Sequence, residues 1–184
     1  MEPVSTAFPI VQALTPFPPA EPGPVRALEV HVLEATASTL ALRYRLDGAL
    51  DQLRIPPSRA SRHTDELWRH TCFEAFLRSR DSAAYYELNV SPSTEWALYS
   101  FTGYRQGMAP VNGAAPPDVR MQRTAHRLQM DVRLDLRSLS RVSSLALAAV
   151  VEDQNARLSY WALRHPPGKP DFHHPDSFAL ELRP

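Results

Sequence analysis

Hydrophobic residues recur at every second position through much of the chain from Val25 onward. The clearest case is the segment 128–134, where Leu, Met, Val and Leu alternate with amide or charged side chains, and the segments 28–32 and 40–46 show the same spacing. A period of two is typical of β-strands that bury one face. The segment 145–151 is apolar at every position, which predicts a central strand covered on both faces.

Turn-forming residues separate these segments. Examples are Asp47-Gly48, Asn112-Gly113 and Pro166-Pro167-Gly168, which mark chain reversals at intervals of about ten residues. The only helical candidate is a turn or two around residues 135–141. The pattern therefore predicts an all-β fold, a single antiparallel β-sandwich of about nine to eleven strands.

The first 24 residues have a different composition. They contain seven prolines: Pro3, Pro9, Pro16, Pro18, Pro19, Pro22 and Pro24. Proline has no backbone N–H and is excluded from helix interiors and central strands. We interpret residues 1–24 as an extended arm and residues 25–184 as the sandwich domain.

Charge and cysteine content narrow the function classes. The 184 residues include 20 Lys and Arg and 20 Asp and Glu, so the formal net charge is zero. Nucleic-acid binding needs a strongly basic face, and this balance therefore argues against it. No apolar run approaches membrane-spanning length and no leader pattern opens the chain, so we expect a cytoplasmic protein that does not bind membranes. Cys72 is the single cysteine; we expect it to be a small buried hydrophobic residue.

Candidate binding residues gather between Glu66 and Met108, a stretch rich in aromatic side chains. A strand over 67–77 would place Trp68 and Glu74 on one face, and the next strand would place Glu87 and Asn89 together as a polar ladder. Arg105 follows before a glycine turn. Aromatic faces beside hydrogen-bonding groups are typical of a site for a small polar ligand.

Three runs in the chain carry a resemblance to a known family. They are L-W-x-x-x-x-F-E-A-F-L, Y-Y-E-L-N-V-S-P and D-F-H-H-P-D-S-F-A-L-E-L. They resemble the DOMON-like superfamily, and within it the family 9 carbohydrate-binding modules and small bacterial DOMON-like proteins. The resemblance implies an antiparallel β-sandwich, jelly-roll-like, whose concave face binds sugars, or haem in some cytochrome members.

The resemblance also implies roles for individual residues. Trp68 matches the tryptophan that stacks on the sugar, and Glu74 matches the hydrogen-bonding acid six residues later. Glu87 falls where sugar-binding relatives carry a basic residue, which is a departure from the pattern. Trp161 is the candidate for a second stacking aromatic.

Several functions remain open at this stage. The leading hypothesis is a non-catalytic module that binds a carbohydrate or sugar-like small molecule through Trp68, Glu74, Glu87, Asn89, Arg105 and Trp161. The first alternative is haem binding, for which Met108, Met121, Met130 and the histidines offer axial ligands. The others are acid/base catalysis by Glu74 and Glu87 and a protein-interaction module that docks through the proline-rich arm.

A run of histidines and aspartates lies near the C-terminus: His165, Asp171, His173, His174 and Asp176. These residue types bind divalent metals, but their spacing matches no established ligand motif, and we expect neither a metal nor a cofactor. The resemblance implies instead that this loop closes the sandwich, with Phe172 and Phe178 packed and the imidazoles bonded to backbone.

Overall fold

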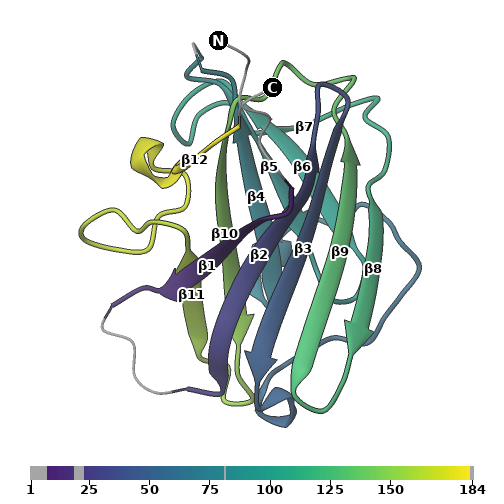
Figure 1. Cartoon of the computed structure of the whole chain (residues 1–184), viewed down its shortest axis with the longest axis vertical. Coiled ribbons are helices and arrows are strands. Elements are labelled where there is room, and N and C mark those ends of the chain that lie inside the picture. The colour runs from purple at the N-terminus through teal and green to yellow at the C-terminus, as the bar shows by residue number, and fades with distance from the viewer. Residues whose placement is uncertain (1–7, 19–22, 81, 183–184) are drawn as a thin grey trace.

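A computed structural model describes residues 8–18, 23–80 and 82–182 (Figure 1). The strands in chain order are β1 (Ile10–Pro16), β2 (Val25–Ala35), β3 (Thr39–Gly48), β4 (Cys72–Arg78), β5 (Tyr85–Val90), β6 (Trp96–Phe101), β7 (Ala109–Pro110), β8 (Asp118–Arg123), β9 (Arg127–Asp135), β10 (Ser144–Glu152), β11 (Leu158–Ala162) and β12 (Leu180–Glu181). Three short 3-10 turns accompany them: η1 (Leu50–Gln52), η2 (Leu67–Arg69) and η3 (Pro175–Ser177).

The strands form one curled antiparallel sheet that folds over itself into two layers. Its hydrogen-bonded order is β7-β6-β5-β4-β10-β11-β1-β2-β3-β9-β8, and β12 adds to β10. We call β1, β2, β3, β9 and β8 the front sheet and β7, β6, β5, β4, β10 and β11 the back sheet, as they lie in Figure 1. The all-β, antiparallel sandwich predicted from the alternating pattern is confirmed.

Strand β1 links the two layers. Ala13 pairs with Glu29 of β2, and Thr15 pairs with Ala162 of β11, so this strand runs obliquely from one sheet to the other (Figure 1). The expectation that the prolines of residues 1–24 exclude a central strand is therefore wrong for this segment. Pro9 precedes the strand and Pro16 is its last residue, so the residues between them keep the N–H donors that strand pairing needs. The remainder of the arm, apart from residues 8–9, 17–18 and 23–24, lies outside the described residues.

The core between the layers is built from the alternating positions. The residues of β2, β3 and β9 that face it are fully or almost fully buried: Leu28, Val30, Val32, Leu40, Leu42, Tyr44, Leu46, Leu128, Met130, Val132 and Leu134.

The helical candidate at 135–141 is wrong, because a single turn in which the Leu139 N–H donates to the Leu136 carbonyl follows β9. Among the described residues, no helix is long and apolar enough to span a bilayer.

The central strands of the back sheet, β4, β5, β6 and β10, are buried on both faces along most of their length. Every residue of β10 is buried, as predicted for 145–151. Its outer face carries a second apolar cluster with β4, β5 and β6, covered by Phe172 and Phe178 from the C-terminal segment. That segment, olive to yellow in Figure 1, packs against the sheet, and the packing of its two phenylalanines agrees with the expectation from the sequence.

Candidate functional site

The outer face of the back sheet holds a buried polar cluster among the apolar side chains. Glu74 of β4 pairs in register with Asn89 of β5, and Glu87 lies two residues away on the same face of β5. Glu74 is 3% exposed, Glu87 is 4% exposed and Asn89 is fully buried. The Asn89 amide donates to Glu87 Oε1 at 2.7 Å. The polar ladder predicted from the sequence thus exists, and it is covered rather than solvated.

Burial changes the acidity of both carboxyl groups. Burial, together with the neighbouring Glu87 carboxylate, raises the pKa of Glu74 well above its usual value. Burial also raises the pKa of Glu87 to about 7, although the hydrogen bond from Asn89 and the positive charge of Arg105 partly oppose this change. Near neutral pH Glu87 is therefore partly ionised, and Glu74 holds its proton more tightly than an exposed carboxyl group does.

One oxygen of the cluster lacks a partner. Among the described residues, no group hydrogen bonds to the buried Glu74 Oε1. Buried polar atoms are nearly always paired, since a lost hydrogen bond costs about 1–3 kcal/mol. Glu74 Oε1 is thus a buried hydrogen-bonding atom that the described part of the fold leaves unsatisfied.

Trp68 lies beside this face but not on a strand. The prediction of a strand over 67–77 is wrong at its beginning, because β4 starts at Cys72 and Trp68 belongs to η2. Glu66, with a φ of 62°, turns the chain into η2. The half-buried indole packs against the outer apolar cluster, 6.0 Å from the Tyr99 ring in an edge arrangement.

Tyr99 connects Trp68 to the carboxyl cluster. This residue of β6 pairs in register with Glu87, and its hydroxyl donates to Asp65 Oδ1 at 2.6 Å. Cys72 lies on the same face as Glu74 and is fully buried, as expected, with its thiol 3.8 Å from Asn89 Oδ1. The face thus presents a partly exposed ring next to buried hydrogen-bonding groups.

A relay of hydrogen bonds from two loops covers Glu87. The Arg105 backbone N–H donates to the Tyr85 hydroxyl at 3.2 Å, and that oxygen lies 2.8 Å from His173 Nδ1. The other ring nitrogen, Nε2, is 3.8 Å from Glu87 Oε2. Burial and the charge of Arg105 lower the pKa of His173 to about 4. The imidazole is therefore neutral at pH 7 and covers Glu87 as a polar group rather than as a cation.

Asp171 holds the two covering loops together. It accepts hydrogen bonds from the Tyr104 hydroxyl, from Arg105 Nη2 at 2.8 Å and from the His173 backbone N–H at 3.1 Å. Although burial alone would raise the pKa of Asp171, the hydrogen bonds from Tyr104 and Arg105 hold it below its usual value. The carboxylate is therefore ionised near neutral pH and fixes Arg105 above the outer face.

Local backbone geometry presents Arg105. The Thr102 N–H donates to the Gln106 carbonyl, and Arg105 takes a φ of 54° within this turn. Gly107 follows with a φ of 63°, where a Cβ would lie 2.5 Å from the Thr102 hydroxyl. Only glycine fits there without displacing that side chain.

Trp161 lies apart from the other candidates. Its side chain is 8% exposed and packs in the core between the sheets, on the opposite face of the back sheet from Glu74. Its indole N–H donates to the Ser159 hydroxyl at 3.1 Å. Of the six predicted site residues, the structure thus gathers Trp68, Glu74, Glu87, Asn89 and Arg105 on one side and leaves Trp161 on the other.

The candidate haem and metal ligands are dispersed. Met121 and Met130 are cross-strand neighbours that pack into the sandwich core, whereas Met108 is exposed on a loop. Within the described residues, no group of three or more His, Cys, Asp or Glu side chains could hold a metal ion.

The histidines of the C-terminal segment have separate partners. His165 bonds the Thr15 carbonyl, and His174 accepts from the Asp176 N–H. The expectation that the imidazoles are bonded to backbone thus fits these two residues. It is wrong for His173, whose ring bonds the Tyr85 hydroxyl.

Sequence reasoning missed several residues of the site. Tyr85 shares the period-two face of Glu87 on β5 and could have been added from spacing alone, whereas Tyr99 reaches that face through the register of β6 against β5. His173 and Asp171 arrive from a loop about 80 residues further along the chain, at sequence separations of 88 from Tyr85 and 66 from Arg105. No local pattern reports such a pairing.

Comparison with known proteins supports the fold. No protein-family model matches the chain, and no curated protein matches it. Among solved structures it is similar to one described as "a putative carbohydrate-binding protein from Bacteroides uniformis ATCC 8492", with a TM-score of 0.64 and 12% sequence identity. The match covers 92% of this chain and 84% of the other. At this identity the likeness concerns the architecture of the sandwich.

Proposed function

We propose that this chain is a non-catalytic module that binds a small carbohydrate or sugar-like molecule on the outer face of the back sheet. The observation that carries the proposal is the buried Glu74 carboxyl, whose Oε1 has no hydrogen-bond partner among the described residues, beside the partly exposed Trp68 indole. Sugars present both an apolar ring face for stacking and hydroxyl groups that bond carboxyl oxygens.

Two further observations support this assignment. The similar solved structure is described as that of "a putative carbohydrate-binding protein", and the motifs around Trp68 and Glu74 resemble those of DOMON-like modules. We therefore propose that the chain is a DOMON-like sugar-binding protein. The cytoplasmic compartment expected from the sequence favours a soluble sugar or a nucleotide sugar over a polysaccharide.

The roles we assign follow from the geometry. Trp68 stacks on the ring face of the sugar, while Glu74 in its protonated form donates or accepts a hydrogen bond. Glu87 is already bonded by Asn89 and acts as an acceptor oriented by that amide. Arg105, fixed by Asp171, supplies a cationic donor at the rim.

Calorimetric titration of the purified chain with monosaccharides, disaccharides and nucleotide sugars tests the proposal. We expect one class to bind, and Glu74→Gln to weaken that binding about 10-fold, because a hydrogen bond to a buried carboxyl group is lost. Monitoring the same mixtures by NMR for products tests the non-catalytic assignment. Turnover of a bound sugar would contradict it, and absence of binding across the panel would overturn the proposal as a whole.

The tryptophans provide a matched control. Trp68→Phe removes part of the stacking surface on the outer face and should weaken binding about 5-fold. Trp161→Phe makes the same change in the sandwich core and should leave affinity unchanged. Equal effects of the two substitutions would place the ligand elsewhere.

A further inference from the structure

A polar concavity lies at one end of the sandwich, lined by none of the residues of the carboxyl cluster. It has a volume of about 480 Å³, and its polar lining residues are Asp51, Arg54, His70, Arg123, Glu152 and Gln154. They come from η1 and the loop after it, the η2–β4 junction, the end of β8 and the β10–β11 hairpin. None of them belongs to the proposed sugar site.

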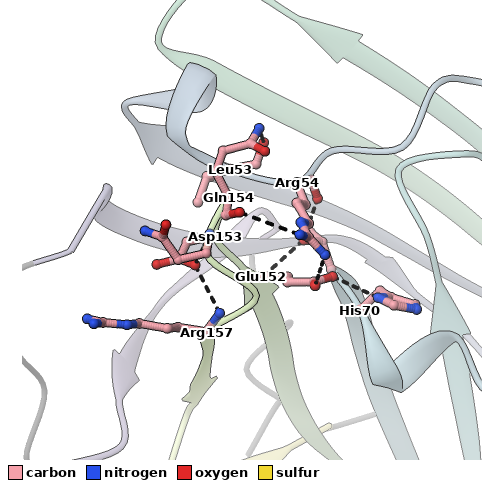
Figure 2. A network of polar contacts seen from close by, with 9 residues as sticks. Leu53, Arg54, His70, Glu152, Asp153, Gln154 and Arg157 are labelled. Atoms are coloured by element: carbon pink, nitrogen blue, oxygen red, sulfur yellow. Dashed lines mark hydrogen bonds and ion pairs between the residues drawn. The ribbon is translucent and has the colours of Figure 1, made fainter.

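Glu152 organises the side chains of this groove. Its carboxylate is buried at the end of β10, with one oxygen accepting from Arg54 Nη1 at 2.9 Å and the other 2.7 Å from His70 Nδ1 (Figure 2). Both oxygens are thus occupied within the protein. The acidic group therefore presents little free acceptor to the groove and acts by orienting its two neighbours.

The His70 ring is turned by this contact. A nitrogen so close to a carboxylate carries a proton and donates it, so Nε2 is the ring nitrogen left for another partner. The His70 side chain is 70% exposed and the Arg54 side chain 49% exposed. Each residue is anchored on Glu152, and Arg54 Nη2 also makes a long 3.5 Å hydrogen bond to the Gln154 carbonyl, while much of both side chains stays exposed (Figure 2).

The backbone of Arg54 is fixed as well. Its N–H donates to the Glu152 carbonyl at 2.9 Å, and its carbonyl accepts from the Thr71 hydroxyl at 2.8 Å. Gln154 donates through its side chain to the Leu53 carbonyl at 3.0 Å. The floor of the groove is thus preorganised before any ligand arrives, which lowers the entropic cost of binding.

Arg123 adds a second guanidinium group from the opposite sheet. It is exposed, and among the described residues its one side-chain hydrogen bond is a long 3.4 Å contact from Nη2 to the Leu50 carbonyl. We propose that Arg54, Arg123 and His70 form a binding site for the oxyanion group, phosphate or carboxylate, of a small molecule. Guanidinium groups bind such groups through paired hydrogen bonds, and an oriented imidazole adds a third donor when it is protonated.

Asp51 opposes this assignment and thereby makes it testable. It is exposed and lines the same groove, so its charge repels an anion. Binding of an oxyanion at this site requires that the two guanidinium groups, joined by the imidazole in its protonated form, outweigh Asp51. Neutralising Asp51 should then strengthen binding, whereas a site for a cation or a neutral molecule would respond in the opposite way or remain unchanged.

The test is an NMR titration of the full chain at constant ionic strength, with inorganic phosphate in one series, acetate in a second and chloride in a third. We expect the His70 ring and Arg54 Nε–H resonances to shift with phosphate or with acetate and not with chloride. The responding series identifies the oxyanion. Absence of a shift in both series, or an equal response to chloride, would overturn the proposal.

Substitutions separate a site from a general charge effect. Arg123→Gln and His70→Gln should each weaken binding of the responding anion about 10-fold, and Asp51→Asn should strengthen it about 3-fold. Arg120→Gln is the matched control, because Arg120 lies on the same strand β8 and pairs with Asp118 outside the groove. An Arg120→Gln effect equal to that of Arg123→Gln would refute a specific site.

Discussion

The two sheets of the sandwich direct alternate side chains away from the shared core, yet their outer faces are built differently. On the front sheet the outward residues form exposed or half-exposed ion pairs, such as Arg43 with Asp131 and Arg127 with Asp47. On the back sheet the outward Glu74 and Glu87 are buried under loops. Ion pairs in water contribute little to stability, whereas buried carboxyl groups change both acidity and stability.

This difference shows what an alternating pattern does and does not encode. A period of two predicts which side chains point away from the core, but it does not predict whether those side chains face solvent or pack against another part of the chain. Here the segments carrying Arg105 and Asp171 cover one face only. The covered face is the one with an unsatisfied carboxyl oxygen, which makes it the candidate site. Changes made in pairs, one on each outer face, test the comparison.

The largest difference is expected for apolar packing. Phe76 points outward on β4, is fully buried and contacts the rings of Tyr85, Phe172 and His173. Phe76→Ala should lower the free energy of unfolding by about 3–5 kcal/mol, because it removes a large side chain and leaves a cavity. Urea denaturation measures this change.

A matched substitution on the front sheet is Gln129→Ala. Gln129 points outward on β9 and is half-exposed, so the change should stay within about 0.5 kcal/mol. If Phe76→Ala proved equally mild, the outer face of the back sheet would be solvated and the comparison would fail.

Acidity gives the next largest effect. The pKa of Glu87 is raised from 4.5 to about 7 in the folded protein. The stability that protonated Glu87 contributes is therefore fully present below its pKa of 4.5 in the unfolded chain, and it is lost as the pH rises through 7. As the pH rises from about 5 to 8, the free energy of unfolding of Glu87→Gln should increase by about 2–3 kcal/mol relative to that of the unsubstituted protein, because glutamine does not ionise. Urea denaturation at both pH values measures it.

The measured quantity is the difference in the free energy of unfolding between the Glu87→Gln variant and the unsubstituted protein. This difference is needed because His173, present in both proteins, changes stability with pH in the opposite direction. Its folded pKa is lowered to about 4, so it adds stability as pH rises toward its ordinary value of 6.5. On the front sheet, Asp47 has a pKa held below its usual value by Arg127. Asp47→Asn should therefore show no change between the same two pH values. A flat Glu87→Gln difference would mean that water reaches Glu87.

A smaller contrast is expected between two aspartates. Asp171→Asn leaves Arg105 without its carboxylate under the covering loops and should lower the free energy of unfolding by about 1–3 kcal/mol. Asp131→Asn removes the partner of Arg43 on the front sheet, where both side chains are partly exposed, and should cost at most about 1 kcal/mol. Thermal unfolding of the two variants side by side checks the order, and a reversed order would contradict the assigned role of Asp171 in holding the cover.

The sequence predicted the sandwich and much of one site face, and its failures have identifiable physical causes. Alternation predicted the core-facing residues of β2, β3 and β9 and placed Glu87 and Asn89 together, since these relations are local. It failed for Trp68, because the left-handed Glu66 starts a 3-10 turn that interrupts the apparent strand. It also failed for β1, where proline content was averaged over 24 residues although the paired stretch lacks an internal proline.

Other features were beyond local reasoning. Trp161 obeys the same alternation as its neighbours, but which of its two faces meets the core depends on the register of β11 against β10, where Trp161 pairs with Ala149. The cover over Glu87 depends on where the C-terminal segment returns to the sheet. Both are consequences of tertiary packing that no pattern within one strand contains.

The smallest predicted effect concerns Glu74 and has an unusual sign. Glu74→Met replaces a buried carboxyl group, one oxygen of which has no hydrogen-bond partner among the described residues, with an unbranched apolar side chain of similar length. This should raise the free energy of unfolding by about 1 kcal/mol, because the cost of burying an unpaired polar group is removed. Urea denaturation near neutral pH measures the gain, and calorimetry should show that sugar binding is lost in the same variant.

Glu95 provides the control for that substitution. It is also buried on the back-sheet side, but its oxygens accept from Arg62, Thr64 and Ser93, so Glu95→Met should destabilise the fold by about 1–3 kcal/mol. Opposite signs for the two variants would mean that the fold does not need the Glu74 carboxyl, which leaves ligand binding as the reason for its presence. If both variants lost stability to the same extent, Glu74 would be a structural residue like Glu95, and the difference between the two outer faces would reflect packing alone.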